Sequence, residues 1–284
     1  MTALSRRTLI GGALAAAGLA AFPARAAPLA KVIANGVLRV AVYRDFAPWS
    51  WRRGGAVVGI DVELGEALAK AIGVRAEIID FMADETADDD LRNMVWRGPL
   101  IGGSAADVMM HAPYDRVFAK ANDRVAIVAP YYREGFALAC DRDTDCEVPP
   151  PQLKGKRLIT ELDSIPDFYF SGSFGGVLRG DVKHEMTALA AIDKVKGKQA
   201  DAVLATRAQI EHAMSLPDAK DLVLRKGPLP ALPSPGWDVA LAVKDDSRDL
   251  GDKLDEIITT FRGDGTLAAI FARYGVALKP PLAG

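Results

Sequence analysis

The sequence is poor in the residues from which catalytic and metal sites are built. It has two cysteines and three histidines, His111, His184 and His212, in 284 residues. The histidines lack metal-ligand spacing, and no Ser-His-Asp set can be recognised around them. Segment 172–176 lacks the lysine of a phosphate loop and the spacing of a nucleophile elbow, so we interpret it as a turn. We therefore expect no catalytic residue, no metal and no cofactor.

Basic residues are also in short supply. The 35 lysines and arginines are outnumbered by 37 aspartates and glutamates, which gives a formal net charge of −2 at pH 7. Removal of residues 1–26 would take away three arginines and no acid, leaving 32 basic and 37 acidic residues and a net charge of −5. A mildly acidic chain without a basic run is a poor partner for nucleic acid or an anionic membrane surface. We expect neither partner.

The acidic residues include one dense run, at Asp84, Glu85, Asp88, Asp89 and Asp90. Carboxylate oxygens are the ligands that hard cations prefer, but this run lacks the glycine and the spacing of an EF-hand loop. Acids at the start of a helix also interact favourably with its dipole. We interpret the run as a solvated helix start.

Long apolar runs are missing except at the N-terminus. Arg6 and Arg7 precede a Gly/Ala/Leu stretch that reaches about residue 21, and Ala24-Arg25-Ala26 gives an A-x-A signal. This pattern is typical of an export signal cut after Ala26. The paired arginines favour the twin-arginine route, with Sec export as the alternative. We expect a monomeric periplasmic protein without stable membrane insertion.

The two cysteines, Cys140 and Cys146, are close in sequence. In an oxidising compartment such a pair favours a small disulfide over a metal site or a redox centre. Closing so short a loop contributes about 2–3 kcal/mol of stability.

What the sequence does contain is an alternation of short apolar strands with amphipathic helices, which predicts an α/β fold with mainly parallel sheets. Segment 37–42 reads as the first strand. Asp61 is expected to cap a helix that ends at Gly73, followed by a strand over 75–79. Near the C-terminus, helical stripes over 250–261 and 267–274 end at glycines.

A near-repeat indicates two lobes built on one plan. Segment 106–112, Ala-Asp-Val-Met-Met-His-Ala, resembles segment 200–206, Ala-Asp-Ala-Val-Leu-Ala-Thr, and each looks like a buried strand. Ligands of open parallel sheets sit beyond the carboxyl ends of the strands. The ends of both segments would then face each other across a cleft. The alternative is that Ala-Asp-Val is simply a common way to enter a strand.

Two crossings between the lobes are expected, near 133–140 and 233–239, where the second is stiffened by prolines. After the export signal (1–26), the first lobe would cover 27–136, the second 137–236, and residues 237–284 would return to the first. Two strands that join two lobes form a hinge, and a hinge lets a cleft close.

The candidate ligand residues follow the ends of predicted strands. Aromatic side chains there suit a flat or apolar ligand, although local packing is the alternative. Arg116 could hold a carboxylate or could be a solvated charge paired with Asp115. Histidine at a strand end is more often hydrogen-bonded than functional. The candidates are Tyr43, Phe46, Trp49, Trp51, His111, Tyr114, Arg116, Tyr131, Glu161, Ser164 and Thr206.

Several segments together resemble family 3 extracytoplasmic solute-binding proteins. The matches are the first strand with Ala47-Pro48-Trp49 and Gly59-Ile60-Asp61, the Pro130-Tyr131-Tyr132 segment, Leu153-Lys154-Gly155-Lys156, and Arg262-Gly263-Asp264-Gly265-Thr266-Leu267. They occur in order over nearly all the chain after residue 26. The resemblance implies a two-lobed, type II periplasmic-binding-protein fold and a role as the solute receptor of an ABC importer.

Segments 90–95 and 106–113 also resemble the MxaJ-like branch of such proteins. That resemblance implies an accessory of a periplasmic quinoprotein (PQQ-dependent) alcohol or methanol dehydrogenase, with the dehydrogenase or its cytochrome as partner.

The sequence departs from the amino-acid-binding members in both charged anchors. Arg116 and Arg124 flank the position of the carboxylate-binding arginine, and Thr206 stands where an ammonium-binding aspartate is expected. A buried zwitterion needs both charges paired. We therefore expect a ligand other than an ordinary amino acid. A cyclic-acid dehydratase, with Glu161 or Asp163 as general acid beside Arg116, is the least favoured alternative.

Overall fold

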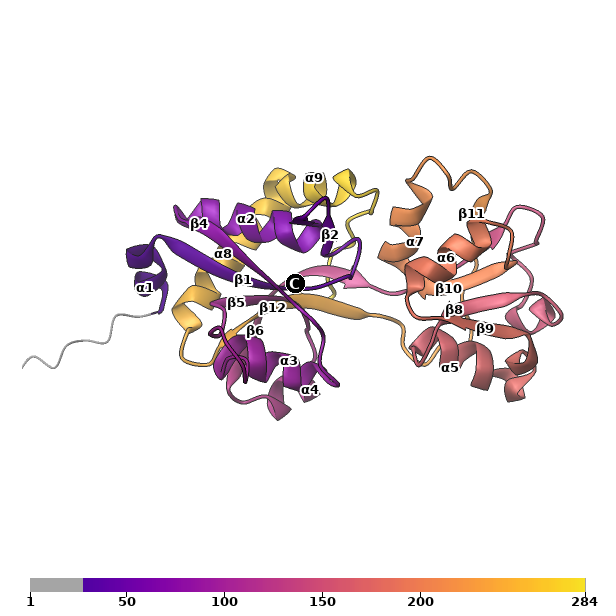
Figure 1. Cartoon of the computed structure of the whole chain (residues 1–284), viewed down its shortest axis with the longest axis horizontal. Coiled ribbons are helices and arrows are strands. Elements are labelled where there is room, and N and C mark those ends of the chain that lie inside the picture. The colour runs from indigo at the N-terminus through magenta and orange to yellow at the C-terminus, as the bar shows by residue number, and fades with distance from the viewer. Residues whose placement is uncertain (1–27, 284) are drawn as a thin grey trace, which may run out of the picture.

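The computed structural model describes residues 28–283, which fold into two lobes joined by crossing segments (Figure 1). The expected export signal over residues 1–26 lies outside the described residues.

The first lobe is a five-stranded sheet in the order β4-β1-β5-β12-β6. Strand β1 runs parallel to β4 and β5, whereas β12 runs antiparallel to β5 and β6. The strands are β1 (Val37–Tyr43), β4 (Arg75–Phe81), β5 (Val108–Pro113), β6 (Val125–Glu134) and β12 (Trp237–Lys244). A hairpin of β2 (Trp51–Arg53) and β3 (Ala56–Val58) follows β1.

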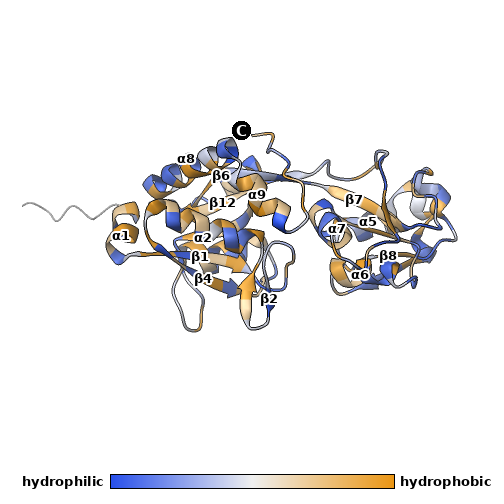
Figure 2. Ribbon diagram, turned by 90° about the horizontal axis from the view of Figure 1, so that it is seen from above, coloured by the Kyte–Doolittle hydropathy of each residue, from blue (hydrophilic) through white to orange (hydrophobic). Residues whose placement is uncertain are grey.

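Helices cover both faces of this sheet, which explains why its strands are rich in β-branched and aliphatic residues rather than alternating with polar ones. One face carries α1 (Pro28–Asn35), α2 (Ile60–Ile72), α8 (Arg248–Asp264) and α9 (Thr266–Arg273). The other face carries α3 (Ala87–Leu91), the π-helical turn η1 (Arg92–Trp96) and α4 (Arg116–Ala121). Figure 2 shows hydrophobic residues along the strands and on part of each helix.

The second lobe repeats this plan with a five-stranded sheet in the order β11-β7-β10-β8-β9. Its strands are β7 (Phe136–Asp141), β8 (Leu158–Glu161), β9 (Val182–Glu185), β10 (Ala202–Thr206) and β11 (Leu222–Leu224). Its main helices are α5 (Ile165–Gly172), α6 (Ala188–Lys196) and α7 (Arg207–Met214), with short 3-10 turns η2 (Pro150–Leu153), η3 (Phe174–Gly176) and η4 (Arg179–Asp181).

Two segments connect the lobes. The first passes from β6 to β7 through Gly135, and the second passes from β11 to β12 through residues 225–236. They meet where Trp237 pairs with Glu134. Gly236 has φ +114°, and a Cβ there would lie 2.2 Å from the Glu134 carbonyl oxygen, so only glycine fits this close approach.

The C-terminal tail lies along the same connection. The amide of Arg133 donates to the Lys279 carbonyl at 2.9 Å, and the amides of Leu282 and Ala283 both donate to Asp238 Oδ2 at 3.0 Å. The tail therefore packs on the hinge as a third segment.

Two predicted helix ends are corrected. Asp61 does not cap α2, because the helix starts after Gly59 and the Asp61 side chain turns into the protein. Gly59 (φ +139°) is required there, since a Cβ would lie 2.1 Å from the Trp49 carbonyl oxygen. Gly263 lies inside α8, which ends at the left-handed Gly265. The predicted end of α2 at Gly73 is confirmed.

The acidic run at the start of α3 has the role of a helix start. Asp88, Asp89 and Asp90 occupy the first turn, and the Thr86 side chain accepts a hydrogen bond from the Asp89 amide. Asp90 is buried and accepts a hydrogen bond of 2.8 Å from the Tyr43 hydroxyl.

The disulfide between Cys140 and Cys146 is confirmed. Both sulfurs lie in the core of the second lobe, at the end of β7. We expect the double variant C140A/C146A to lose about 2–3 kcal/mol of the free energy of unfolding, because the open loop gains freedom in the unfolded chain. Urea unfolding measures the loss. A reductant should destabilise the wild type and leave the variant unchanged, and equal stabilities would contradict the prediction.

Candidate ligand-binding site between the two lobes

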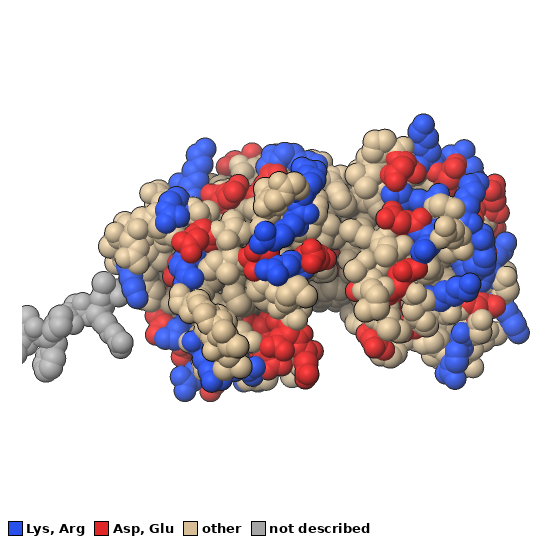
Figure 3. Space-filling view, in the orientation of Figure 1, with Lys and Arg blue, Asp and Glu red and all other residues tan. Residues whose placement is uncertain are grey.

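The second lobe presents a pocket of about 200 Å³ at the carboxyl ends of β8 and β10. Figure 3 shows a hollow between the two lobes on this side of the molecule. Three residues predicted from the sequence, Glu161, Ser164 and Thr206, line the pocket. Its other polar residue, Gln209, was not predicted. The remaining lining residues are Phe136, Ile165, Pro166, Ala188, Leu204, Ala205 and Trp237.

The two hydroxyl groups of this pocket, those of Ser164 and Thr206, form the hydrogen bonds that cap helices α5 and α7. Ser164 accepts a hydrogen bond from the Asp167 amide at 3.2 Å and donates to the Glu161 carbonyl at 2.7 Å, which fixes the start of α5. Thr206 donates to Gln209 Oε1 at 2.8 Å and accepts from the Gln209 amide, which forms the capping box of α7. These residues therefore shape the pocket and position its helices.

Glu161 is the charged residue of the pocket. It ends β8 and lines the pocket together with Ala188, the first residue of α6. Burial raises the pKa of Glu161, and the Ala188 amide offsets only part of that effect.

Two aromatic side chains come from the two crossing segments. The rings of Phe136 and Trp237 lie 5.3 Å apart and are tilted by 53°. Trp237 lies in the second predicted crossing, near 233–239, but neither ring was predicted to line the pocket. Nothing in a single β-strand pattern shows that the first residue beyond a crossing faces a cleft.

The first lobe places His111 in the second half of β5, next to a buried carboxylate. Asp61 Oδ2 lies 3.3 Å from His111 Nδ1, and Asp61 Oδ1 accepts a hydrogen bond of 2.6 Å from Tyr131. The His111 side chain is 8% exposed, and its Nδ1 is completely buried. Burial raises the pKa of Tyr131 well above its ordinary value, with Asp61 adding to the effect, so Tyr131 stays the hydrogen-bond donor.

Two predicted ligand residues belong to the core instead. Trp49 and Tyr131 are both 0% exposed, and the Trp49 ring packs against His111, Tyr132 and Phe271. The loop after β1 folds back over the sheet, so its apolar side chains fill the space beneath it. These two residues cannot touch a ligand in this conformation.

The other aromatic candidates of the first lobe are only partly covered. Phe46 meets the His111 ring edge-on at 5.0 Å, and Tyr43 stacks at a tilt on Phe81. Trp51 lies against His212 of the second lobe, with ring centroids 5.6 Å apart. Trp51 therefore sits at a contact between the lobes.

The remaining candidates of the first lobe, Tyr114 and Arg116, are exposed at the start of α4. Asp115 accepts hydrogen bonds from the amides of Val117 and Phe118, both at 2.8 Å, and so serves as the helix cap.

The lobes touch beside the cleft. His212 Nδ1 lies 2.8 Å from the Tyr274 carbonyl oxygen, and Glu211 Oε2 accepts a hydrogen bond of 2.8 Å from the Ala277 amide. Gly275 is so close to Ser215 that a Cβ would lie 2.2 Å from the serine Cβ. These contacts join α7 to the chain that follows α9.

A larger cavity of about 650 Å³ follows the crossing segments and the C-terminal tail. Its lining includes five basic residues, but Arg133 pairs with Asp238 at 3.1 Å and Arg225 donates to the Cys146 and Val148 carbonyls. We do not regard it as the ligand site, because it lies away from the strand ends that converge on the cleft. The basic residues are Arg133, Arg207, Arg225, Lys226 and Lys279.

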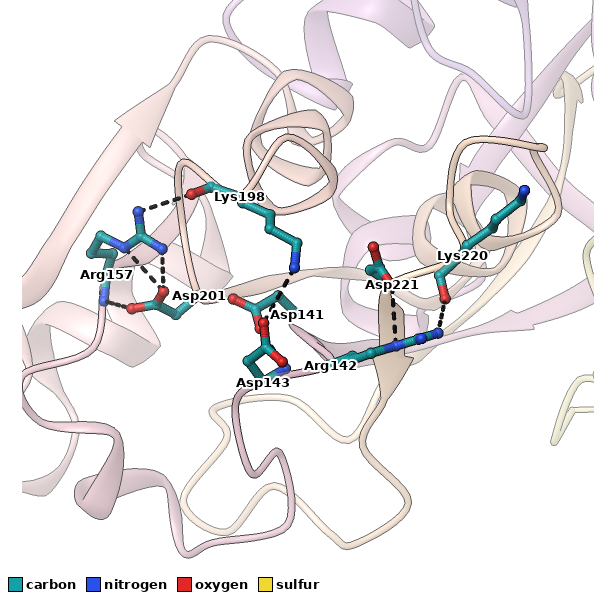
Figure 4. Close-up of polar contacts among 8 residues, drawn as sticks. All are labelled: Asp141, Arg142, Asp143, Arg157, Lys198, Asp201, Lys220 and Asp221. Carbon is teal, nitrogen blue, oxygen red and sulfur yellow. Dashed lines mark hydrogen bonds and ion pairs between the residues drawn. The ribbon is translucent and has the colours of Figure 1, made fainter.

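The far end of the second lobe carries charges that neutralise one another (Figure 4). Arg157 pairs with Asp201, Lys198 lies 3.2 Å from Asp143, and Arg142 lies 3.0 Å from Asp221. Strands β8 and β10 begin at this end, opposite to the pocket. We therefore assign these charges to the stabilisation of the strand starts.

Within residues 28–283, no group of three or more His, Cys, Asp or Glu side chains is arranged to hold a metal ion. None of the helices in this part of the chain is long and apolar enough to cross a membrane.

No protein-family model and no curated protein matches the chain. Solved structures do. An ancestral cationic amino acid solute-binding protein, AncCDT-1, is 18% identical with a TM-score of 0.68 over 87% of this chain and 98% of that one. An amino acid ABC transporter substrate-binding protein from Streptococcus pneumoniae, bound to L-arginine, is 18% identical with a TM-score of 0.63 over 89% and 99%.

The VFT2 domain of Bordetella pertussis BvgS is 22% identical, with a TM-score of 0.61 over 87% of this chain and 97% of that one. At such low identities, the similarity to these structures shows a shared fold and nothing about the ligand. The predicted fold is confirmed: it is the two-lobed α/β fold of type II periplasmic binding proteins.

Proposed function

We propose that this protein is a periplasmic solute-binding protein that closes its cleft around a small ligand and delivers it to an ABC importer. The observation that carries the proposal is the composition of the pocket. Phe136 and Trp237 come from the two crossings, while Glu161 and Thr206 come from strand ends of the second lobe. Rotation about the crossings would change the position of this pocket relative to His111, which is what ligand-driven closure requires.

The same pocket argues against an ordinary amino acid as ligand. Its lining contains an acid and no lysine or arginine, so a ligand carboxylate would lack a partner on the second lobe. Thr206 stands in the place expected for an ammonium-binding aspartate, but its side chain forms the capping box of α7 with Gln209. The ligands named for the similar structures therefore do not transfer to this chain.

The test is to identify what co-purifies with the protein by mass spectrometry. Each identified molecule is then titrated into protein that has been stripped of ligand by partial unfolding. We expect a calorimetric heat of binding and a smaller radius of gyration by X-ray scattering when the ligand is bound. A protein that brings down no small molecule and shows no response to a broad solute panel would contradict the proposal.

A second candidate function is favoured by apolar side chains around the start of α5 and the end of β9. Leu162, Ile165, Phe168 and Met186 are 45%, 38%, 58% and 78% exposed. Exposed apolar residues gathered next to a cleft are typical of a protein-contact surface. With the MxaJ-like segments, they support an accessory of a periplasmic PQQ-dependent alcohol dehydrogenase.

Pull-down from periplasm separates the two functions. The accessory role predicts recovery of the dehydrogenase or its cytochrome with the wild type, and loss of recovery with F168S/M186S. Recovery of neither protein with the wild type would reject the accessory role and leave the solute-binding role in place.

A further inference from the structure

The Glu161 carboxylate is a charge without a counter-ion in an apolar pocket. The Ala188 amide opposes the rise of its pKa, and no lysine or arginine of the described chain lines the pocket. Glu185 provides the contrast: it sits beside Glu161 on the neighbouring strand β9, and it pairs with Lys194 at 3.5 Å. A half-buried carboxylate that lacks such a partner favours the binding of a cation.

The neighbours of Glu161 cannot supply the missing positive charge. Ser164 bonds to Glu161 and Asp167 at the start of α5, whereas Thr206 and Gln209 bond to each other at the start of α7. The acids Asp163 and Asp167 lie in the same turn, and Asp167 is buried against His184 at 2.8 Å. This wall of the cleft is therefore negative in character.

The remaining walls suit an organic cation rather than a metal ion. Phe136 and Trp237 present two rings to the pocket, and aromatic faces attract cations through their quadrupoles. Ile165 and Pro166 add apolar surface that a hydrated metal ion would not use.

The first lobe carries acids on its side of the hollow as well. The loop before α3 and its first turn include the exposed Asp84, Glu85 and Asp88, and Figure 3 shows acidic side chains gathered over this part of the lobe. Acids on both sides of an opening raise the local concentration of cations.

We infer that the ligand of this pocket is a small organic ammonium ion without a carboxylate, held by Glu161 and the rings of Phe136 and Trp237. This inference rests on the proposed solute-binding function and specifies its ligand class. The absence of a basic residue from the pocket explains why a carboxylate on the ligand would be unfavourable.

Calorimetry with matched probes tests the inference. The probes are n-butylammonium and phenethylammonium, with butyrate and 3-phenylpropionate as anions of similar shape. The variants are E161Q, which removes the charge and keeps the length of the side chain, and E185Q, which removes the same charge from the neighbouring strand outside the pocket. We expect an ammonium probe to bind the wild type and E185Q with similar affinity, and E161Q about 10- to 100-fold more weakly.

Two results would overturn the inference while leaving solute binding intact: the anions bind and the ammonium probes do not, or E161Q binds an ammonium probe as tightly as the wild type. If neither ammonium probe binds and the co-purifying molecule is not a cation, the inference also fails. If no probe binds and no small molecule co-purifies, the proposed function fails together with it.

Discussion

Replacing Trp49 with alanine is expected to lower the free energy of unfolding by about 3–5 kcal/mol. The Trp49 ring is fully buried and contacts His111, Tyr132 and Phe271, with ring centroids 4.5, 5.2 and 5.7 Å away. Alanine would leave a cavity between the loop after β1 and helix α9, and the surrounding structure could close it only in part.

Urea unfolding followed by circular dichroism measures the loss, and Trp51 provides the matched control. Trp51 lies two positions along the chain but is only partly buried, against Tyr274 and His212. We expect W51A to cost much less than W49A. Equal losses in the two variants, or a W49A protein as stable as the wild type, would show that the loop after β1 is not part of the core.

The second large effect concerns Glu134, the last residue of β6. Its side chain is 1% exposed; Oε1 accepts hydrogen bonds from the amides of Gly135 at 2.9 Å and Ala208 at 3.4 Å, and Oε2 has no partner. Burial raises the pKa of Glu134 to about 8. The folded protein therefore keeps this proton at pH values where the unfolded chain, near pKa 4.5, has lost it.

Folding must then take up a proton between pH 4.5 and 8, so the contribution of Glu134 to stability falls as pH rises through this window and is constant above it. The upper limit of the effect is about 5 kcal/mol, at about 1.4 kcal/mol for each pH unit. We expect E134Q, which keeps an acceptor for both amides, to be close to the wild type at pH 5 and several kcal/mol more stable at pH 8.

Urea unfolding of both proteins at four pH values between 5 and 8 measures this difference, because other titrating groups cancel in the comparison. Glu147 is the control that should not change over this range: the amides of Lys226 and Gly227 lower its pKa from its ordinary value of 4.5, so its contribution to stability is constant between pH 5 and 8 and is lost only at lower pH. A difference between E134Q and the wild type that does not change with pH would show that Glu134 is ionised in the folded protein.

Glu134 also links the hinge to the second lobe. Glu134 accepts a hydrogen bond from the Ala208 amide, which belongs to the first turn of α7. Trp237, on β12, pairs with Glu134 at the end of β6. The buried acid therefore sits where both crossings and the capping box of α7 meet.

Local patterns were sufficient to predict three of the residues that line the second lobe's pocket. Glu161, Ser164 and Thr206 follow strand ends, and the carboxyl ends of neighbouring parallel strands meet at one edge of a sheet. That rule needs only strand order along the chain and no knowledge of side-chain packing. Phe136 was missed because its position in the cleft depends on how the first crossing bends at Gly135.

The aromatic loop after β1 shows the limit of the same reasoning. Phe46, Trp49 and Trp51 look alike in sequence, yet one meets His111, one fills the core and one touches the other lobe. Asp61 likewise reads as a helix cap, and only the position of Tyr131 on β6, seventy residues away, turns it into a buried acceptor.

The sequence by itself determined the α/β class, the two lobes, the disulfide and the strand ends that form the second lobe's pocket. These follow from local periodicity and from short-range chemistry, which a single chain displays directly. Only the tertiary structure decided which aromatic rings are buried, that Glu134 is a desolvated acid, and that Glu161 lacks a counter-ion. Burial and pairing depend on residues far apart along the chain, so no local pattern contains them.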